Sequence, residues 1–200
     1  MQWSLVGSEM CIRDRIRNGW HVVAVVSAMS KETNKLIDLA KQVGVENLVD
    51  PEYDSLISTG EDVSSSLLAI ALNSIKISSR SWRGWQLPIR TNSFHSNAKI
   101  EEIKTNHIID SFKEGVKVAV VSGFQGIEQA GRITTLGRGG SDTSAVAIAA
   151  AIDAERCDIY TDVSGIYTTD PRIKRNASKL KKISFEEMLE MASLGANVLQ

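Results

Sequence analysis

An uninterrupted apolar run occupies residues 21–27, His21-Val22-Val23-Ala24-Val25-Val26-Ser27. Such a run, followed by small polar residues, is typical of a buried central strand in a parallel sheet. The next segment, 31–43, predicts a helix because its apolar residues fall on one stripe: Leu36, Ile37, Leu39, Ala40 and Val43. A strand followed by a crossover helix is the repeating unit of parallel α/β folds.

The same alternation continues along the chain. We expect strands at 75–79, 116–122 and 157–161, and helices at 62–72, 141–154 and 184–194. Ser184 followed by Glu187 is the pattern of a capping box at the start of the last helix. The order predicts an α/β fold, a three-layer α/β/α sandwich with an open, mainly parallel central sheet. Ligands of such sheets bind beyond the carboxyl ends of the strands, so the segments after Ser27, Gly123 and Thr161 should converge.

The composition is that of an ordinary globular protein: 42% of the 200 residues are hydrophobic and 24% are charged, with a net charge of -1. No apolar run is long enough to span a bilayer, and the near-neutral charge gives no reason to expect nucleic acid or a membrane as partner. Neither Cys11 and Cys157 nor His21, His95 and His107 stand at the spacing of metal ligands, so we expect no metal role for them. We expect a cytoplasmic protein.

The most informative segment for function is 134–143, Thr134-Thr135-Leu136-Gly137-Arg138-Gly139-Gly140-Ser141-Asp142-Thr143. Its glycines let the backbone approach a ligand, the helix start offers free N–H groups, and Arg138 adds a fixed positive charge. The segment therefore predicts an anion site. The alternative is a tight turn in which Ser141 or Asp142 only caps the helix.

A second segment, 160–172, follows the strand expected at 157–161 and is rich in hydroxyls and carboxylates. It is suited to a nucleotide, with Asp162 on ribose or Mg²⁺, Tyr167 against the base and Arg172 on phosphate. The alternative is a hydrophilic turn.

Two shorter signals lie near the same edge of the predicted sheet. Ser30 and Thr33 stand between the first strand and its helix, where either one could serve only as a cap. Glu61 stands at a helix start, where the helix dipole stabilises an acid; a buried Glu61 could instead receive the ammonium group of an amino acid. No Walker motif or dinucleotide fingerprint is present.

Six stretches of the sequence match a known pattern in order and in spacing over roughly residues 16–200. They are residues 25–30 with Thr33-Asn34, 58–61, 123–126, 134–143, 159–172 and 184–192. On these residues the chain resembles the aspartate kinases of the amino acid kinase family. The resemblance implies the amino acid kinase fold. It also implies ATP-dependent phosphorylation of the side-chain carboxylate of L-aspartate to 4-phospho-L-aspartate, the entry to lysine, threonine and methionine synthesis.

The resemblance also implies roles for individual residues. The positions similar to substrate contacts are Thr33, Glu61, Arg138 and Ser141, and those at the reacting end are Arg138, Ser141 and Asp142. The nucleotide positions are Ser27, Gly139, Gly140, Thr161, Asp162, Tyr167 and Arg172. ATP and Mg²⁺ are implied, with Asp142 organising Mg²⁺ and no dedicated protein metal site.

The resemblance further sets expectations for domain organisation. We expect residues 1–15 to be a non-native leader, residues 16–200 to be part of a catalytic domain truncated at both ends, and regulatory ACT domains to be absent. The family's opening Lys-Phe-Gly-Gly-Thr-Ser motif is missing and Asn197 stands where a lysine is usual, so the 200-residue chain is expected to be inactive. The full-length parent is expected to be a homo-oligomer. The alternatives are a kinase of acetylglutamate or glutamate, and a non-catalytic nucleotide-binding remnant.

Overall fold

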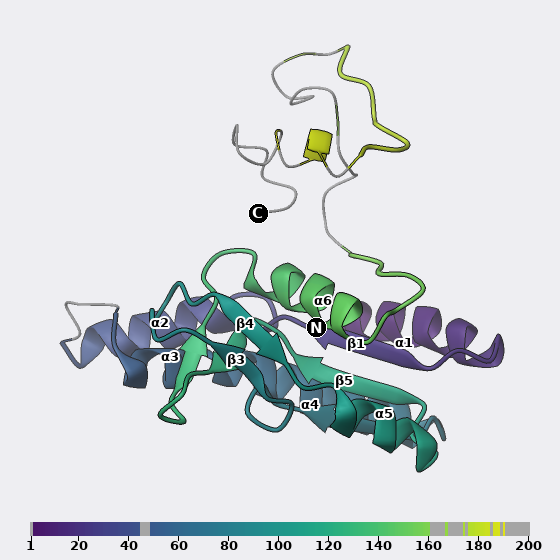
Figure 1. Ribbon diagram of the computed structural model, residues 1–200, viewed down its shortest axis with the longest axis horizontal. Helices are drawn as coiled ribbons and strands as arrows, with labels where there is room; N and C mark the ends of the chain where they lie inside the picture. Colours follow the sequence, from purple (N-terminus) through teal and green to yellow (C-terminus); the bar gives the residue numbers. More distant parts are fainter. Residues whose placement is uncertain are drawn as a thin grey trace. The chain divides into compact units, whose positions relative to one another are not determined.

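The computed structural model describes residues 2–44, 49–160, 167, 174, 176–184, 186–188 and 190, with the backbone alone for 2–9. The chain divides into two compact units, Met1–Cys157 and Asp158–Gln200. The helices of the first unit are α1 (Gln2–Arg17), α2 (Glu32–Gln42), α3 (Pro51–Ile57), α4 (Thr59–Ser74), α5 (Asn106–Lys113) and α6 (Gly140–Ala151) (Figure 1). Its strands are β1 (Val22–Val26), β2 (Ser79–Trp82), β3 (Ile89–Thr91), β4 (Ile100–Ile103), β5 (Val118–Ser122), β6 (Gln125–Ile127) and β7 (Ile133–Thr135).

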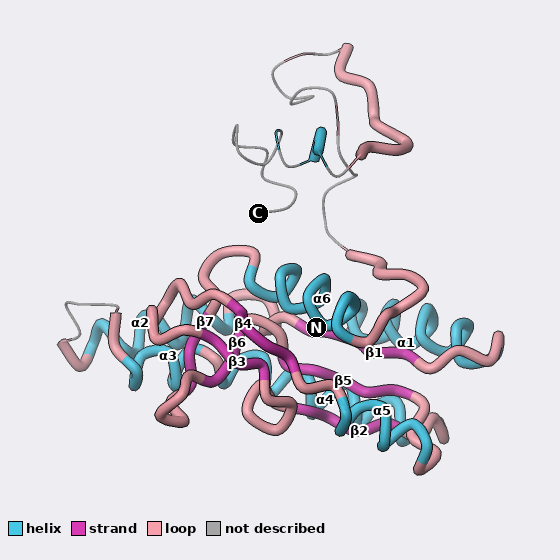
Figure 2. The backbone as a smooth tube through the Cα atoms, viewed as in Figure 1, coloured by secondary structure: helices cyan, strands magenta, loops and turns pink. Residues whose placement is uncertain are grey.

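The first sheet is parallel and has the strand order β1-β5-β2 (Figure 2). Val22 of β1 and Ser79 of β2 both stand opposite Val118, the first residue of the central strand β5. All five residues of β5 are buried. This arrangement confirms a parallel strand at the apolar run 21–27. The prediction of a buried central strand was wrong for the described residues, because β1 lies at the edge of this sheet and is half-buried, whereas β5 takes the central position.

Helices cover both faces of this sheet because successive side chains of a strand point to opposite sides. Val118 and Val120 pack with residues of α1 and α4, whereas Ala119 and Val121 pack with Ile108 of α5 and with α6. The three predicted layers are therefore present in the first unit.

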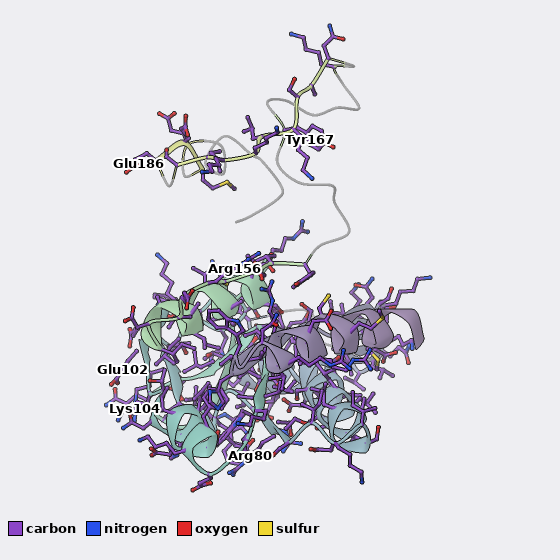
Figure 3. All side chains as sticks on the ribbon, turned by 90° about the vertical axis from the view of Figure 1, so that its right-hand side faces the viewer. Arg80, Glu102, Lys104, Arg156, Tyr167 and Glu186 are labelled. Carbon is purple, nitrogen blue, oxygen red and sulfur yellow. The ribbon has the colours of Figure 1, made fainter. Side chains whose placement is uncertain are left out.

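The second sheet has the order β4-β3-β6-β7 and is mixed, since only β3 and β6 are parallel. The chain passes from β5 to β6 through Phe124, whose φ of 67° is in the left-handed region. The expected single, mainly parallel sheet is thus divided in two at this turn. The outer strand β4 and the residues after it carry charged, exposed side chains, among them Glu102 and Lys104 (Figure 3).

Two predicted strands differ from the structure. The strand expected at 75–79 begins only at Ser79, because α4 continues to Ser74 and Lys76 then takes a left-handed φ of 66°. The strand expected at 157–161 was wrong for its described part, since residues 157–160 form no strand. Tyr160 is 73% exposed there, so this segment lacks the burial that its apolar pattern suggested.

The second unit shows the predicted capping box. The amide of Ser184 donates to Glu187 Oε2 over 2.9 Å, and the amide of Glu187 donates to Ser184 Oγ over 3.2 Å. Ser184 itself is not helical and residues 186–188 and 190 are helical, whereas residues 185, 189 and 191–194 of the helix expected at 184–194 lie outside the described residues. Tyr167 forms an antiparallel bridge with Lys179; Tyr167 and Glu186 are labelled in Figure 3.

Helix α1 spans most of the segment expected to be a non-native leader. Ile12 is buried in the core with Leu68, Leu72 and Val118. The domain boundary at residue 16 stays a prediction, although the packing of Ile12 extends the core four residues further toward the N-terminus. Among the described residues no helix has both the length and the apolar character needed to cross a membrane.

Candidate active site

A cavity of about 650 Å³ opens at the carboxyl ends of β1 and β5. It is lined by Ser27, Ala28, Thr33, Asn34, Ile37, Tyr53, Ile57, Glu61, Ser96, Phe124, Thr135, Gly137, Arg138, Gly139, Gly140, Ser141 and Asp142. The segments that follow Ser27 and Gly123 therefore meet, as expected from their places at the ends of parallel strands.

The glycine segment forms one wall of the cavity and leads into α6. Gly137 and Gly139 have φ of 76° and 68°, in the left-handed region that glycine adopts without strain. Gly139 is the residue before the helix, and no side chain caps the helix there. Ser141 and Asp142 lie within the first turn, so the expectation that one of them caps the helix is wrong, whereas the positive φ expected of the glycines in a tight turn is present.

The turn around Phe124 is fixed to this helix start by hydrogen bonds. The Phe124 amide donates to Ser144 Oγ over 3.1 Å, and Ser144 Oγ donates to the carbonyl of Gly140 over 2.9 Å. A Cβ added at Gly140 would stand 2.8 Å from the Phe124 ring, and one added at Gly123 would stand 2.9 Å from Ser141 Cβ. The β5–β6 turn and the start of α6 therefore pack in direct contact, which places Phe124, Ser141 and Asp142 on one cavity.

Glu61, at the start of α4, is the most unusual group in the cavity. It is 3% exposed; its Oε1 accepts a 2.9 Å hydrogen bond from the Ala28 amide, and its buried Oε2 has no partner among the described residues. Burial raises the pKa of this carboxyl from 4.5 to about 7, against the lowering effect of the Ala28 amide. An unpartnered buried carboxylate oxygen is costly unless a cation or donor reaches it.

A partly buried polar network around Asp62 holds the first turn of α4, in which Glu61 also lies. Asp62 Oδ1 accepts from Ser122 Oγ over 2.9 Å and from Gln125 Nε2 over 3.1 Å. Arg83 Nε lies 3.3 Å from Asp62 Oδ2. Asp62 is therefore paired through both of its carboxylate oxygens, whereas its neighbour Glu61, which lines the cavity, has an Oε2 without a partner among the described residues.

The start of α2 forms another part of the cavity wall. Lys31 precedes the helix with a φ of 67° and makes no side-chain cap, and Thr33 lies in the first helical turn. Neither Ser30 nor Thr33 caps the helix, so the capping alternative for these residues is wrong. Thr33 instead lies on the cavity.

The cavity collects most of the positions suggested by sequence. Eight of them line it: Ser27, Thr33, Glu61, Arg138, Gly139, Gly140, Ser141 and Asp142. Tyr167 belongs to the second unit, and Thr161, Asp162 and Arg172 lie outside the described residues. Sequence reasoning missed Tyr53 and Ser96, whereas Phe124 and Thr135 stood in quoted stretches without a role.

The charges in the cavity are few and of both signs. Arg138 is an exposed cation, whereas Glu61 and Asp142 supply carboxylates. Within the described part of the chain no group of three or more His, Cys, Asp or Glu side chains is arranged to hold a metal ion. The arrangement suits a small ligand that carries both an anionic and a cationic group.

The comparisons with known proteins all indicate the same protein family. The profile of the amino acid kinase family matches residues 11–200. An aspartokinase of Bacillus sp. (strain MGA3) is 55% identical over 183 residues, which are 92% of this chain and 44% of that protein. The chain thus spans less than half the length of this curated relative.

Solved structures of aspartate kinases are also similar to this chain. Aspartate kinase from Synechocystis superposes with a TM-score of 0.81 at 45% identity, over 98% of this chain and 32% of that one. E. coli aspartokinase III in complex with aspartate and ADP superposes with a TM-score of 0.71 at 36% identity, over 84% of this chain and 38% of that one. With its fold, its cavity and a family profile that covers nearly its whole length, the chain belongs to the amino acid kinase family.

Proposed function

We propose that this chain is part of an aspartate kinase, which transfers the γ-phosphate of ATP to the side-chain carboxylate of L-aspartate and yields 4-phospho-L-aspartate. The observation that carries the proposal is the pairing of unlike charges in one cavity. Arg138 offers a guanidinium, and the buried Glu61 offers a carboxylate oxygen with no partner among the described residues. An amino acid with a free ammonium and a carboxylate satisfies both.

Phosphoryl transfer requires mainly that the enzyme position the two substrates and neutralise their negative charge. The attacking carboxylate of L-aspartate is already ionised at neutral pH, so no general base is needed. Arg138 pairs with a substrate carboxylate, Glu61 and Thr33 bind the rest of the substrate, and Ser141 and Asp142 stand at the reacting end. The free N–H groups at the start of α6 favour the negative charge of the transferred phosphoryl group.

ATP and Mg²⁺ follow from this reaction. Ser27, Gly139 and Gly140 lie on the cavity, where a backbone without bulky side chains accommodates phosphate. Asp142 is the carboxylate we assign to Mg²⁺, which proteins commonly bind through one or two carboxylates together with substrate phosphates. The nucleotide roles of Thr161, Asp162, Tyr167 and Arg172 stay predictions, as does the function of this enzyme in cytoplasmic lysine, threonine and methionine synthesis. A homo-oligomeric parent is likewise proposed.

The alternative substrate acetylglutamate fits the charges of the cavity less well than L-aspartate. An N-acetylated amino acid such as acetylglutamate lacks the ammonium group that would satisfy Glu61. The relative at 55% identity is named an aspartokinase, and the E. coli structure contains aspartate and ADP. The non-catalytic alternative, a nucleotide-binding remnant, predicts ATP binding without phosphoryl transfer.

The test is a hydroxamate assay, in which hydroxylamine traps the acyl phosphate, on the full-length parent protein with ATP and Mg²⁺. We expect hydroxamate with L-aspartate and little with L-glutamate or N-acetyl-L-glutamate. A preference for N-acetyl-L-glutamate, or no hydroxamate with any substrate, would contradict the proposal. The same assay on the 200-residue chain tests the expectation that this chain lacks turnover.

A further inference from the structure

Asp54 is a fully buried carboxylate that the proposed reaction does not use. It is 0% exposed and lies on α3, whose first turn is fixed by Asp50 as N-cap and by Pro51. Tyr53, the residue before it, lines the cavity. A buried carboxylate is costly unless it is fully hydrogen-bonded, so its partners show what it holds.

The first set of partners comes from the turn between β3 and β4. His95 Nδ1 donates to Asp54 Oδ2 over 2.8 Å. The Ser96 amide lies 3.1 Å from Oδ1 and 3.0 Å from Oδ2, and Ser96 Oγ lies 3.3 Å from Oδ1. This turn is 41 residues away from Asp54 in sequence, so the carboxylate joins two distant segments.

The second set comes from the end of β7. The Thr135 amide donates to Asp54 Oδ2 over 3.0 Å, and Thr135 Oγ1 donates to Oδ1 over 2.6 Å. Both carboxylate oxygens thus accept hydrogen bonds from the β3–β4 turn and from the end of β7. Every partner is a donor, which an ionised carboxylate can satisfy and an amide cannot.

The segments that Asp54 joins form the cavity wall beside Arg138. Ser96 and Thr135 line the cavity themselves. A Cβ added at Gly137 would stand 3.1 Å from Asn97 Oδ1 and 3.2 Å from the Ser96 carbonyl oxygen, so the glycine segment rests directly on the turn that Asp54 holds. Arg138 is the next residue along the chain.

We propose that Asp54 is a positioning residue for the substrate site: it fixes the turn around Ser96 and the end of β7 against α3, and thereby sets the position of Arg138. This inference rests on the proposed function, because it assigns Asp54 to the binding of L-aspartate. Asp54 itself touches no substrate. Its effect is transmitted through Ser96, Thr135 and Gly137.

The experiment compares the 200-residue chain with its Asp54→Asn and Glu52→Gln variants. Glu52 is a matched control, since it is a carboxylate on the same helix that pairs with Arg132 at an exposed site. Circular dichroism establishes that each variant is folded, calorimetry measures the affinity of the folded protein for L-aspartate, and hydrogen exchange reports the Ser96 and Thr135 amides. A merely structural role would lower stability and leave the affinity of the folded protein unchanged.

We expect Asp54→Asn to weaken L-aspartate binding about tenfold or more, and to speed exchange at Ser96 and Thr135, because donors are left facing an amide N–H. The L-aspartate affinity of Glu52→Gln should stay within about twofold of that of the unsubstituted 200-residue chain, as expected for loss of an exposed ion pair. A folded Asp54→Asn variant with unchanged affinity overturns the proposal.

A second variant covers the case in which Asp54→Asn does not fold. His95→Phe keeps a ring of similar size, removes one donor to Asp54 and lies outside the cavity lining; we expect about threefold weaker binding. Unchanged affinity in this variant overturns the proposal. If the unsubstituted 200-residue chain binds no L-aspartate, the proposed function is contradicted. Unchanged hydrogen exchange at the Ser96 and Thr135 amides in a folded variant would separately overturn the positioning role of Asp54.

Discussion

Glu61 differs from Asp142, the other carboxylate of the described cavity wall, because Glu61 is buried and Asp142 is only half-buried. Burial raises the pKa of Glu61 to about 7, and its Oε2 lacks a partner among the described residues. An ammonium group placed there would favour the ionised form. Binding of an amino acid should therefore release a proton at pH values below about 7.

The first prediction is a pH-dependent affinity. Below pH 7 the ligand must displace the proton of Glu61, so L-aspartate affinity should fall about tenfold per pH unit between pH 7 and pH 5. Glu61→Gln cannot ionise, so its weaker affinity should be flat across this range. Calorimetric titrations at several pH values measure both slopes; parallel slopes for the two proteins would contradict the role of Glu61.

The second prediction concerns stability without ligand. The pKa of Glu61 is higher in the folded chain than the ordinary value of 4.5, so the unfolded chain loses this proton first as the pH rises. The free energy of unfolding should therefore fall, by roughly 3 kcal/mol, between about pH 4.5 and pH 7. Glu61→Gln should remove this contribution. Urea unfolding of both proteins at pH 5 and pH 8 measures it, and an equal change in both would show that other groups are responsible.

The third prediction separates binding from folding at Arg138. This side chain is exposed and lies on the cavity, so Arg138→Ala should cost little stability, within about 0.5 kcal/mol, as for most surface substitutions. Loss of a charge-assisted pair with a substrate carboxylate should weaken L-aspartate binding by tenfold or more. Arg132→Ala is the control, because Arg132 pairs with Glu52 away from the cavity lining. Equal affinities of the two variants would remove Arg138 from the site.

At the scale of elements, the close packing of the β5–β6 turn on the start of α6 gives the fourth prediction. In Gly123→Ala the new methyl group would stand 2.9 Å from Ser141 Cβ and 3.0 Å from Ser141 Cα. Because Cα belongs to the backbone, the helix start must shift, at a cost of about 1–3 kcal/mol and with weaker L-aspartate binding. Gly131→Ala has open space around it and only the strain of its φ of 84°, so it should lower stability and leave affinity unchanged. Thermal unfolding and calorimetry distinguish the two.

The elements that the sequence predicted well are those with a local signal. A strand at the apolar run 21–27 and the small-residue helix from 141 are present, with bounds shifted by a few residues. The strand expected at 75–79 was displaced because Ile75 and Lys76 terminate α4 before the sheet begins, and β-branched residues alone do not mark that boundary.

The parts of the site that sequence did not predict depend on contacts between distant residues. Asp54 had no local signal, because its partners are 41, 42 and 81 residues away. Glu61 was a candidate with two open interpretations, and only its burial and unpartnered Oε2 distinguish them. Such features arise from tertiary packing, which hydrophobic periodicity does not encode.

At the scale of the whole molecule, the fifth prediction concerns where the packed domain begins. Ile12 is 8% exposed within the core cluster of α4 and β5, although it lies in the segment expected to be a leader. Ile12→Ala should lower the free energy of unfolding by about 2–4 kcal/mol, as for truncation of a buried isoleucine. Met10→Ala, at a side chain 54% exposed, should change it by less than about 0.5 kcal/mol. Equal stabilities in urea unfolding would show that residues 1–15 are indeed separate from the domain.

One cavity of the first unit should recognise both charges of an α-amino dicarboxylic acid. The most direct measurement is a calorimetric comparison of L-aspartate with succinate, which keeps both carboxylates and lacks the ammonium group. We predict that the chain binds L-aspartate at least tenfold more tightly than succinate, and that Glu61→Gln abolishes this preference. Equal binding of the two ligands by the unsubstituted chain, or binding of neither, would contradict the recognition of the ammonium group by this cavity.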